Sequence, residues 1–131
     1  MASIMIVDDS SVTRKVIKKH IKSGPYASAE LVEAPNGEQA LENVKGGLKV
    51  DVILSDWNMP KMNGLEFVRG VRAHEAATGV ETPVKVIMIT TEGTIDKVTA
   101  AMESGVNEYI VKPFTADTLT KTLKKVLPLR V

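Results

Sequence analysis

Short apolar runs alternate along this sequence with segments of helical period, and this alternation limits the possible folds more than any other feature. The runs at 4–7, 50–54 and 84–89 are rich in valine and isoleucine and show little alternation of polar and apolar residues. Such runs are typical of strands that are covered on both faces, as in a parallel sheet. Two further runs lie at 29–34 and 109–111. We therefore expect five strands.

Between these runs, apolar residues recur at helical spacing and form stripes along one helix face. The stripes consist of Val12, Val16, Ile17 and Ile21; of Leu65, Val68 and Val71; of Ile95, Val98 and Met102; and of Leu119, Leu123, Val126 and Leu127. The alternation of strand and helix predicts a doubly wound α/β fold with right-handed crossovers. The sequence has no internal repeat, low-complexity tract or linker, so we expect residues 1–131 to form a single domain.

Composition excludes several kinds of function. The formal net charge is +1, so no global field would attract nucleic acid or a membrane surface. The absence of cysteine excludes disulfides, thiol catalysis and thiolate metal sites. No apolar run reaches the length of a membrane span, and the first residues run into Asp8 and Asp9 too soon for a signal peptide. We therefore expect a soluble, cytoplasmic protein that binds neither nucleic acid nor membrane.

Polar side chains follow four of the five predicted strands. Asp8 and Asp9 come after the first strand, Asp56 after the third, Thr90 after the fourth and Lys112 after the fifth, whereas the second strand ends in a turn at 35–37. In doubly wound sheets the functional crevice lies beyond the carboxyl ends of the strands. Three carboxylates, a hydroxyl and an ammonium group should therefore lie together at one edge of the sheet.

Three clustered carboxylates need a cation, because a close pair repels by roughly 4 kcal/mol at an effective dielectric near 20. Lys112 alone cannot balance them. All-oxygen ligands with room for water suit Mg²⁺, and neither histidine lies near a strand end. Beside Mg²⁺, a carboxylate such as Asp56 can attack a phosphoryl group and form an acyl phosphate. Lys112 and the Thr90 hydroxyl would then contact the phosphoryl oxygens.

Each of these residues, taken alone, also has an ordinary structural interpretation. Asp9 could be only the N-cap of the first helix, and Thr90 the cap of the fourth. Lys112 could belong to the solvated surface. We favour a joint site, because chance would have to place complementary groups at the ends of four separate strands.

The same residues resemble the signature of response-regulator receiver domains, which consists here of Asp8-Asp9, Asp56, Thr90 and Lys112-Pro113-Phe114. The resemblance covers nearly the whole chain, and segments 56–66 and 109–115 are similar to those of single-domain chemotaxis regulators. It implies a flavodoxin-like (βα)₅ fold with a five-stranded parallel sheet in the order 2-1-3-4-5. It also implies a two-component signalling function, in which the chain is a phosphoprotein.

The resemblance implies a role for each matching residue. Asp56 would be the phosphoacceptor, and Lys112, placed by a cis bond to Pro113, would pair with the acceptor and then with the phosphoryl group. Mg²⁺ would be held by Asp9 directly, by Asp8 mainly through water, by Asp56, and by Asn58 through its backbone carbonyl.

Thr90 and Tyr109 would form a switch pair, in which the hydroxyl moves toward the phosphoryl group and the ring turns inward. In the alternative interpretation, Tyr109 is a plain aromatic at the edge of the sheet. Asn58, Thr91 and Glu92 flank the site at positions that tune the acyl phosphate in the family. Thr91 departs from the family pattern, which usually has Ala or Gly there. Its bulk could slow small phosphodonors or alter the rotation of Tyr109.

The fourth helix, fifth strand and fifth helix would form the surface that reads out phosphorylation. Lys121, Lys124 and Lys125 on the fifth helix are either a solvated face or a dock for an acidic, amphipathic peptide. With no attached output domain, a monomer would act in trans. The expected partners are a histidine kinase, a target such as the flagellar motor switch in chemotaxis, and, as a further candidate, a phosphatase. A phosphorelay intermediate or a phosphate sink is the alternative within the family.

Two functions from other classes are less favoured. A Mg²⁺-dependent aspartyl-phosphate hydrolase typically needs a second Asp two residues after the nucleophile, and Asn58 occupies that position. We therefore expect a phosphoacceptor that assists its own phosphorylation and dephosphorylation, not an enzyme that turns over external substrate. A flavin carrier is disfavoured because three carboxylates would repel the flavin phosphate.

Overall fold

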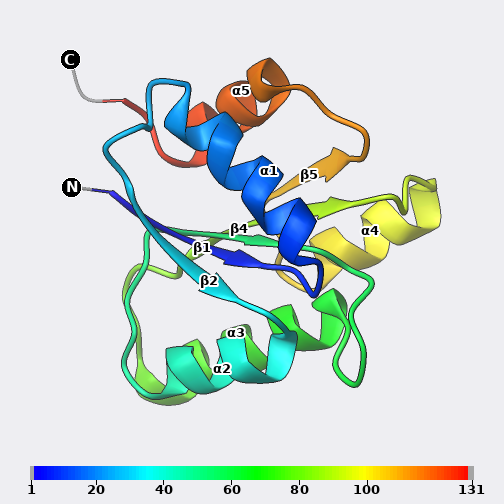
Figure 1. Ribbon diagram of the computed structural model, residues 1–131. Coiled ribbons are helices and arrows are strands. Elements are labelled where there is room, and N and C mark those ends of the chain that lie inside the picture. The colour runs from blue at the N-terminus through cyan, green and yellow to red at the C-terminus, as the bar shows by residue number, and fades with distance from the viewer. Residues whose placement is uncertain (1, 130–131) are drawn as a thin grey trace.

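The computed structural model describes residues 2–129, in which strands and helices alternate as the sequence predicts (Figure 1). The strands are β1 (Ser3–Val7), β2 (Glu30–Ala34), β3 (Val52–Ser55), β4 (Lys85–Thr90) and β5 (Glu108–Val111). The helices are α1 (Ser11–Lys22), α2 (Gly37–Lys45), α3 (Gly64–Thr78), α4 (Ile95–Glu103) and α5 (Ala116–Val126). Each strand begins and ends within two residues of its predicted bounds. None of the helices within residues 2–129 combines the length and the hydropathy of a membrane span.

The five strands form one sheet in the order β2-β1-β3-β4-β5, and all neighbouring strands are parallel. This confirms both the fold class and the strand order. From β1 the chain crosses to one side of the sheet to form β2, and the later strands lie on the other side. Ligands of doubly wound sheets bind where the winding reverses in this way. The crevice is therefore expected beyond the ends of β1 and β3.

Helices cover both faces of the sheet, with α1 and α5 on one face and α2, α3 and α4 on the other (Figure 1). Strand β1 is buried on both sides: Ile4 and Ile6 pack toward α1 and α5, whereas Met5 and Val7 pack toward the opposite helices. Full burial of such side chains contributes about 1.5–3 kcal/mol each. This explains why the run at 4–7 lacks the polar alternation of a half-exposed strand.

Each helix begins at a polar N-cap whose side chain accepts the N–H of the third residue that follows. The caps are Ser10, Asn36, Asn63, Thr94 and Thr115. Two alternatives from the sequence are therefore wrong. Asp9 does not cap α1, because Ser10 does, and Thr90 does not cap α4, because Thr94 does. Both side chains remain available for other contacts.

Two of the predicted apolar stripes are only partly buried. The exposed members are Val12 (69% exposed), Val16 (43%), Ile95 (84%) and Met102 (41%). Helix α1 packs through Ile17 and Ile21 in its C-terminal half, and the fully buried residue of α4 is the small Ala101. The helical period correctly predicted these faces, but it does not indicate how much of each face the sheet covers.

Candidate functional site

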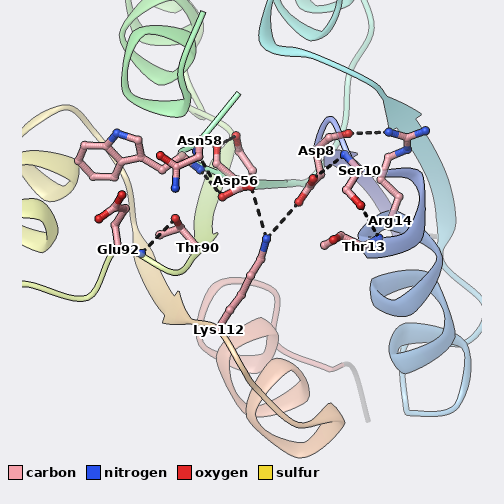
Figure 2. A network of polar contacts seen from close by, with 11 residues as sticks. Asp8, Ser10, Thr13, Arg14, Asp56, Asn58, Thr90, Glu92 and Lys112 are labelled. Carbon is pink, nitrogen blue, oxygen red and sulfur yellow. Dashed lines mark hydrogen bonds and ion pairs between the residues drawn. The ribbon is translucent and has the colours of Figure 1, made fainter. Parts of the chain in front are cut away.

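The carboxyl ends of β1, β3 and β5 bring the predicted acidic and basic side chains together, as Figure 2 shows. One carboxylate oxygen from each of Asp8, Asp9 and Asp56 lies within 4.8 Å of the others. This follows from the sheet register, in which Val7 of β1 lies opposite Ser55 of β3, one residue before Asp8 and Asp56 respectively. The predicted acidic cluster is therefore present at the predicted edge.

Lys112 lies between two of these carboxylates. Its Nζ atom lies 3.3 Å from Asp8 Oδ2 and 3.4 Å from Asp56 Oδ2. The side chain is 20% exposed, so the interpretation of Lys112 as ordinary solvated surface is wrong. The peptide bond between Lys112 and Pro113 is cis, as expected. One ammonium thus pairs with two of the three carboxylates, and the cluster keeps an excess of negative charge.

Asp56 has two oxygens in different surroundings. Oδ1 accepts the backbone N–H of Trp57 at 2.7 Å and that of Asn58 at 3.4 Å, whereas Oδ2 faces Lys112. The residue is 8% exposed. Backbone donors therefore fix the orientation of the carboxylate through Oδ1, while Oδ2 pairs with Lys112.

A close approach of the following helix holds the loop after β3 in place. Gly64, at the start of α3, donates its N–H to the Trp57 carbonyl at 2.8 Å. A Cβ atom at position 64 would collide with the Asp56 carbonyl oxygen. Glycine at this position thus allows α3 to pack directly against the loop that carries Asp56.

Asp8 is the most buried carboxylate of the cluster, at 2% exposure. Burial raises the pKa of Asp8, and the negative charge of Asp56 adds to that effect. The Ser10 N–H, which donates to Asp8 Oδ1 at 2.9 Å, and the Lys112 ammonium both lower this pKa, but burial outweighs them. The lysine therefore compensates the buried charge only in part.

These groups fit a hard divalent cation. The three carboxylates offer oxygen ligands only, and Asp9 is exposed, which leaves room for water on one side of the cluster. Mg²⁺ favours such sites, because it retains several of its waters beside a few carboxylates. Asp8, Asp9 and Asp56 could hold the ion. The backbone carbonyl of Asn58 as a further ligand stays a prediction, although its N–H lies beside Asp56.

Thr90 and Tyr109, the predicted switch pair, both contact the backbone of Glu92. Thr90 is fully buried, and its Oγ1 accepts the Glu92 N–H at 3.3 Å (Figure 2). The Tyr109 hydroxyl donates to the Glu92 carbonyl, and the ring packs against the core beneath α3 and α4. Burial raises the pKa of Tyr109, and the charges of Glu92 and Asp56 raise it further.

The remaining tuning positions border the site. Asn58 and Thr91 are exposed, and Glu92 is half-buried. Their effects on an acyl phosphate stay predictions. Sequence reasoning placed Glu92 beside the site but missed that its backbone joins Thr90 to Tyr109, because a backbone contact requires no particular residue type.

Sequence reasoning also missed a contact that Arg14 makes with the loop after β1. Its guanidinium Nη1 donates to the Asp8 carbonyl at 2.6 Å, and Figure 2 shows the side chain beside the loop after β1. An arginine six residues after the first aspartate, one turn into the following helix, was the available signal. In a helix with several basic residues, that signal does not stand out.

Comparison with known proteins agrees with this geometry. Residues 4–124 match the protein family described as the response regulator receiver domain. The chain is 43% identical over 124 residues to chemotaxis protein CheY1 of Helicobacter pylori, and the alignment covers 95% of each chain.

Solved structures with the same fold include two informative neighbours. Chemotaxis protein CheY4 of Vibrio cholerae superposes with a TM-score of 0.81 at 35% identity, over 97% of this chain and 99% of that chain. The receiver domain of the sensor histidine kinase PA1611 from Pseudomonas aeruginosa has a TM-score of 0.80 at 25% identity, over 95% and 96% of the two chains. That neighbour contains a magnesium ion coordinated in its active-site cleft.

Proposed function

The chain belongs to the response regulator receiver domain family, and from this premise we propose that Asp56 accepts a phosphoryl group with the help of Mg²⁺. The phosphorylated chain then binds a target in trans through the surface formed by α4, β5 and α5. The strongest support comes from Lys112, whose ammonium lies between Asp8 and Asp56 at 3.3 and 3.4 Å. An ammonium in this position is suited to neutralise phosphoryl oxygens as they arrive at Asp56.

The residues of the cluster have separate tasks in the transfer. Asp56 forms a bond from a carboxylate oxygen to phosphorus while the bond from phosphorus to the donor breaks, and the donor group leaves with that electron pair. Asp8, Asp9 and Asp56 would hold Mg²⁺, with the Asn58 backbone carbonyl as an additional ligand. When bound, the metal supplies positive charge for the phosphoryl oxygens. The Thr90 hydroxyl donates a hydrogen bond to one of these oxygens.

Phosphorylation then acts on the contacts around Glu92. A shift from a mostly inactive to a mostly active population requires about 5.5 kcal/mol of differential stabilisation. One hydrogen bond to a charged group contributes roughly 1.5–3 kcal/mol. Thr90, Lys112 and the bound partner must therefore share the task. Thr91, Glu92 and Asn58 at the rim set how long the phosphoryl group persists.

The output surface has the character of a partner site. Ile95, Met102 and Val111 are exposed on α4 and β5, and Lys124 is exposed on α5. Lys121 and Lys125 form exposed ion pairs with Asp117 and Glu108. Apolar side chains beside lysines favour an acidic, amphipathic segment. Because the relatives include chemotaxis proteins, we take the target to be the flagellar motor switch and the phosphodonor to be a histidine kinase. A phosphatase is a further candidate partner.

We take residues 1–131 to be a single receiver domain that acts as a monomer in the cytoplasm. The chain serves as a phosphoacceptor and not as an enzyme with an external substrate, because the amide of Asn58 cannot act as an acid two residues after Asp56. Light scattering with and without acetyl phosphate tests the monomer, and turnover of a phosphate ester would contradict the acceptor function.

Labelling with acetyl phosphate tests the proposed function. The wild-type chain should gain one phosphoryl group by intact mass only when Mg²⁺ is present, and Asp56→Asn should gain none. Asp117→Asn, which changes an exposed carboxylate on α5, serves as the matched control and should label like the wild type. Labelling of Asp56→Asn at the wild-type rate would exclude Asp56 as the acceptor.

Binding of a motor-switch peptide distinguishes a chemotaxis messenger from a phosphate sink or relay intermediate. A chemotaxis messenger should bind this peptide more tightly when it is activated with beryllofluoride. A phosphate sink or relay intermediate should show no gain in affinity.

A further inference from the structure

The loop that carries Asp8 and Asp9 is held by a residue of the next helix. Arg14 Nη1 donates to the Asp8 carbonyl oxygen at 2.6 Å, and Arg14 Nε donates to Glu33 Oε1 at 3.1 Å. The Arg14 side chain is 16% exposed. The guanidinium therefore joins the loop after β1 to strand β2.

The contacted carbonyl belongs to the peptide that links the two aspartates. On the β3 side, the last sheet bond is the Asp56 N–H to the Val7 carbonyl at 3.0 Å, one residue before Asp8. On the β2 side, the Asp8 N–H donates to the Ala34 carbonyl at 3.3 Å, and the Asp8 carbonyl accepts from Arg14, which is bound to Glu33 of that strand. The orientation of this peptide plane sets the direction in which the Asp9 side chain leaves the backbone.

Glu33 fixes the guanidinium from the other end. Its carboxylate also accepts a bond from Lys18 at 3.1 Å. The hydrogen bond from Lys18 and the one from Arg14 hold the pKa of Glu33 below its ordinary value. A planar guanidinium presents its donors in a rigid fork, so it can bind the carboxylate and the carbonyl at once. A lysine ammonium is a point charge and does not supply this geometry.

We propose that Arg14 is a positioning residue for the metal site, holding the Asp8–Asp9 peptide so that both carboxylates face the position of Mg²⁺. This inference rests on the proposed function, because it requires that the acidic cluster bind the ion. Arg14 does not touch the metal. It acts through the backbone of the residues that do.

When Arg14 is replaced, loss of its hydrogen bonds and loss of its charge should change the affinity for Mg²⁺ in opposite directions. Arg14 is a cation near a cation site, so loss of its charge alone would strengthen Mg²⁺ binding. Loss of its hydrogen bond to the Asp8 carbonyl would weaken Mg²⁺ binding instead. Groups that orient metal ligands in this way typically change affinity by about 10–100-fold when they are removed. A weaker affinity for Mg²⁺ in an Arg14 variant therefore indicates a positioning role, and a stronger affinity indicates an effect of charge alone.

Calorimetric titration of the intact chain with Mg²⁺ is the test. The Arg14→Gln and Arg14→Lys variants should both bind about tenfold more weakly than the wild type. Lys15→Gln removes one positive charge from the neighbouring exposed residue. Lys18→Gln removes the other cation on Glu33 without touching the loop. Both controls should bind as tightly as the wild type or more tightly.

Unfolding curves must show that each variant is folded at the titration temperature, and Arg14→Lys decides the test if Arg14→Gln does not fold. Wild-type or tighter affinity in Arg14→Gln, or full rescue by Arg14→Lys, would overturn the positioning role. A wild-type chain that does not bind Mg²⁺ would instead overturn the proposed function. The two failures are thereby distinct.

Discussion

Thr90 and Tyr109 are joined through the backbone of one residue, Glu92. Its N–H donates to Thr90 Oγ1 at 3.3 Å, and its carbonyl accepts the Tyr109 hydroxyl. If Thr90 turns toward a phosphoryl group on Asp56, the Glu92 N–H loses its partner while the carbonyl stays bound to the ring on β5. The loop after β4 would therefore couple the proposed acceptor site to the proposed output surface within three residues.

Replacing Tyr109 with Phe should separate the hydroxyl contact from the packing of the ring. Loss of the bond to the Glu92 carbonyl should lower the free energy of unfolding by about 1 kcal/mol. The rate of acetyl phosphate labelling should stay close to wild type, because the hydroxyl contacts Glu92 and not Asp56. Urea unfolding and intact-mass labelling measure the two effects. A loss of labelling in Tyr109→Phe would show that the hydroxyl serves the transfer itself.

The Asp8→Asn variant should be more stable than the wild type when no metal is present. Carboxylates within 4.8 Å repel by about 3.5 kcal/mol at an effective dielectric near 20. Asp8 faces two such carboxylates, which doubles this gain, and loss of the Lys112 pair at 3.3 Å offsets about 5 kcal/mol of it, so we expect a net increase of roughly 1–2 kcal/mol. Saturating Mg²⁺ should stabilise the wild type, by about 2.7 kcal/mol at one hundred times Kd, and should have little effect on the variant.

Thermal unfolding with and without Mg²⁺ checks both statements. Asp117→Asn is the control and should respond to Mg²⁺ like the wild type. An Asp8→Asn variant that is less stable than the wild type without metal would contradict the interpretation that burial of this charge is costly.

Glu33 should make stability depend on pH in the acid range. Its pKa is lowered from 4.5, so the folded state favours the ionised form. The stabilisation is fully present above the ordinary pKa and is lost as the pH falls through the lower, folded value. The side chain is 36% exposed, so its two ion pairs should contribute only about 0.5–1 kcal/mol together.

The comparison of wild type with Glu33→Gln measures this contribution. The difference in unfolding free energy should be constant above about pH 5 and should shrink below it. A difference that grows as the pH falls would have the wrong sign.

Thr91 should limit access of small phosphodonors. Its side chain is exposed, and it directly follows the buried Thr90. Thr91→Ala should accelerate labelling by acetyl phosphate about threefold, which corresponds to roughly 0.7 kcal/mol in the barrier. Equal rates in the two proteins would show that the threonine does not restrict the entrance.

Most of the site was predictable because parallel topology decides it. Once the runs at 4–7 and 50–54 are neighbouring parallel strands, Asp8 and Asp56 must emerge at the same edge, and this holds for Lys112 as well. The strand order itself was implied by family resemblance. The placement of these side chains was thus predicted from their residue types and from their positions at the ends of strands.

The features that were not predictable depend on packing and on the backbone. Val12 and Ile95 occur at helical spacing, but only the structure shows that the sheet and its helices leave them exposed. The contacts at Glu92 and at the Asp8 carbonyl use peptide groups, which every residue possesses. No sequence pattern distinguishes the peptide groups that receive such contacts.

Chemical trapping of the acyl phosphate tests the central claim most directly. Borohydride reduction of the chain after incubation with acetyl phosphate and Mg²⁺ converts a phosphorylated aspartate to homoserine, which peptide mass mapping then locates. We predict homoserine at position 56 alone, and none when Mg²⁺ is removed by chelation. Homoserine at Asp8 or Asp9, or its absence from position 56 in the presence of Mg²⁺, would contradict the claim that Asp56 is the phosphoacceptor.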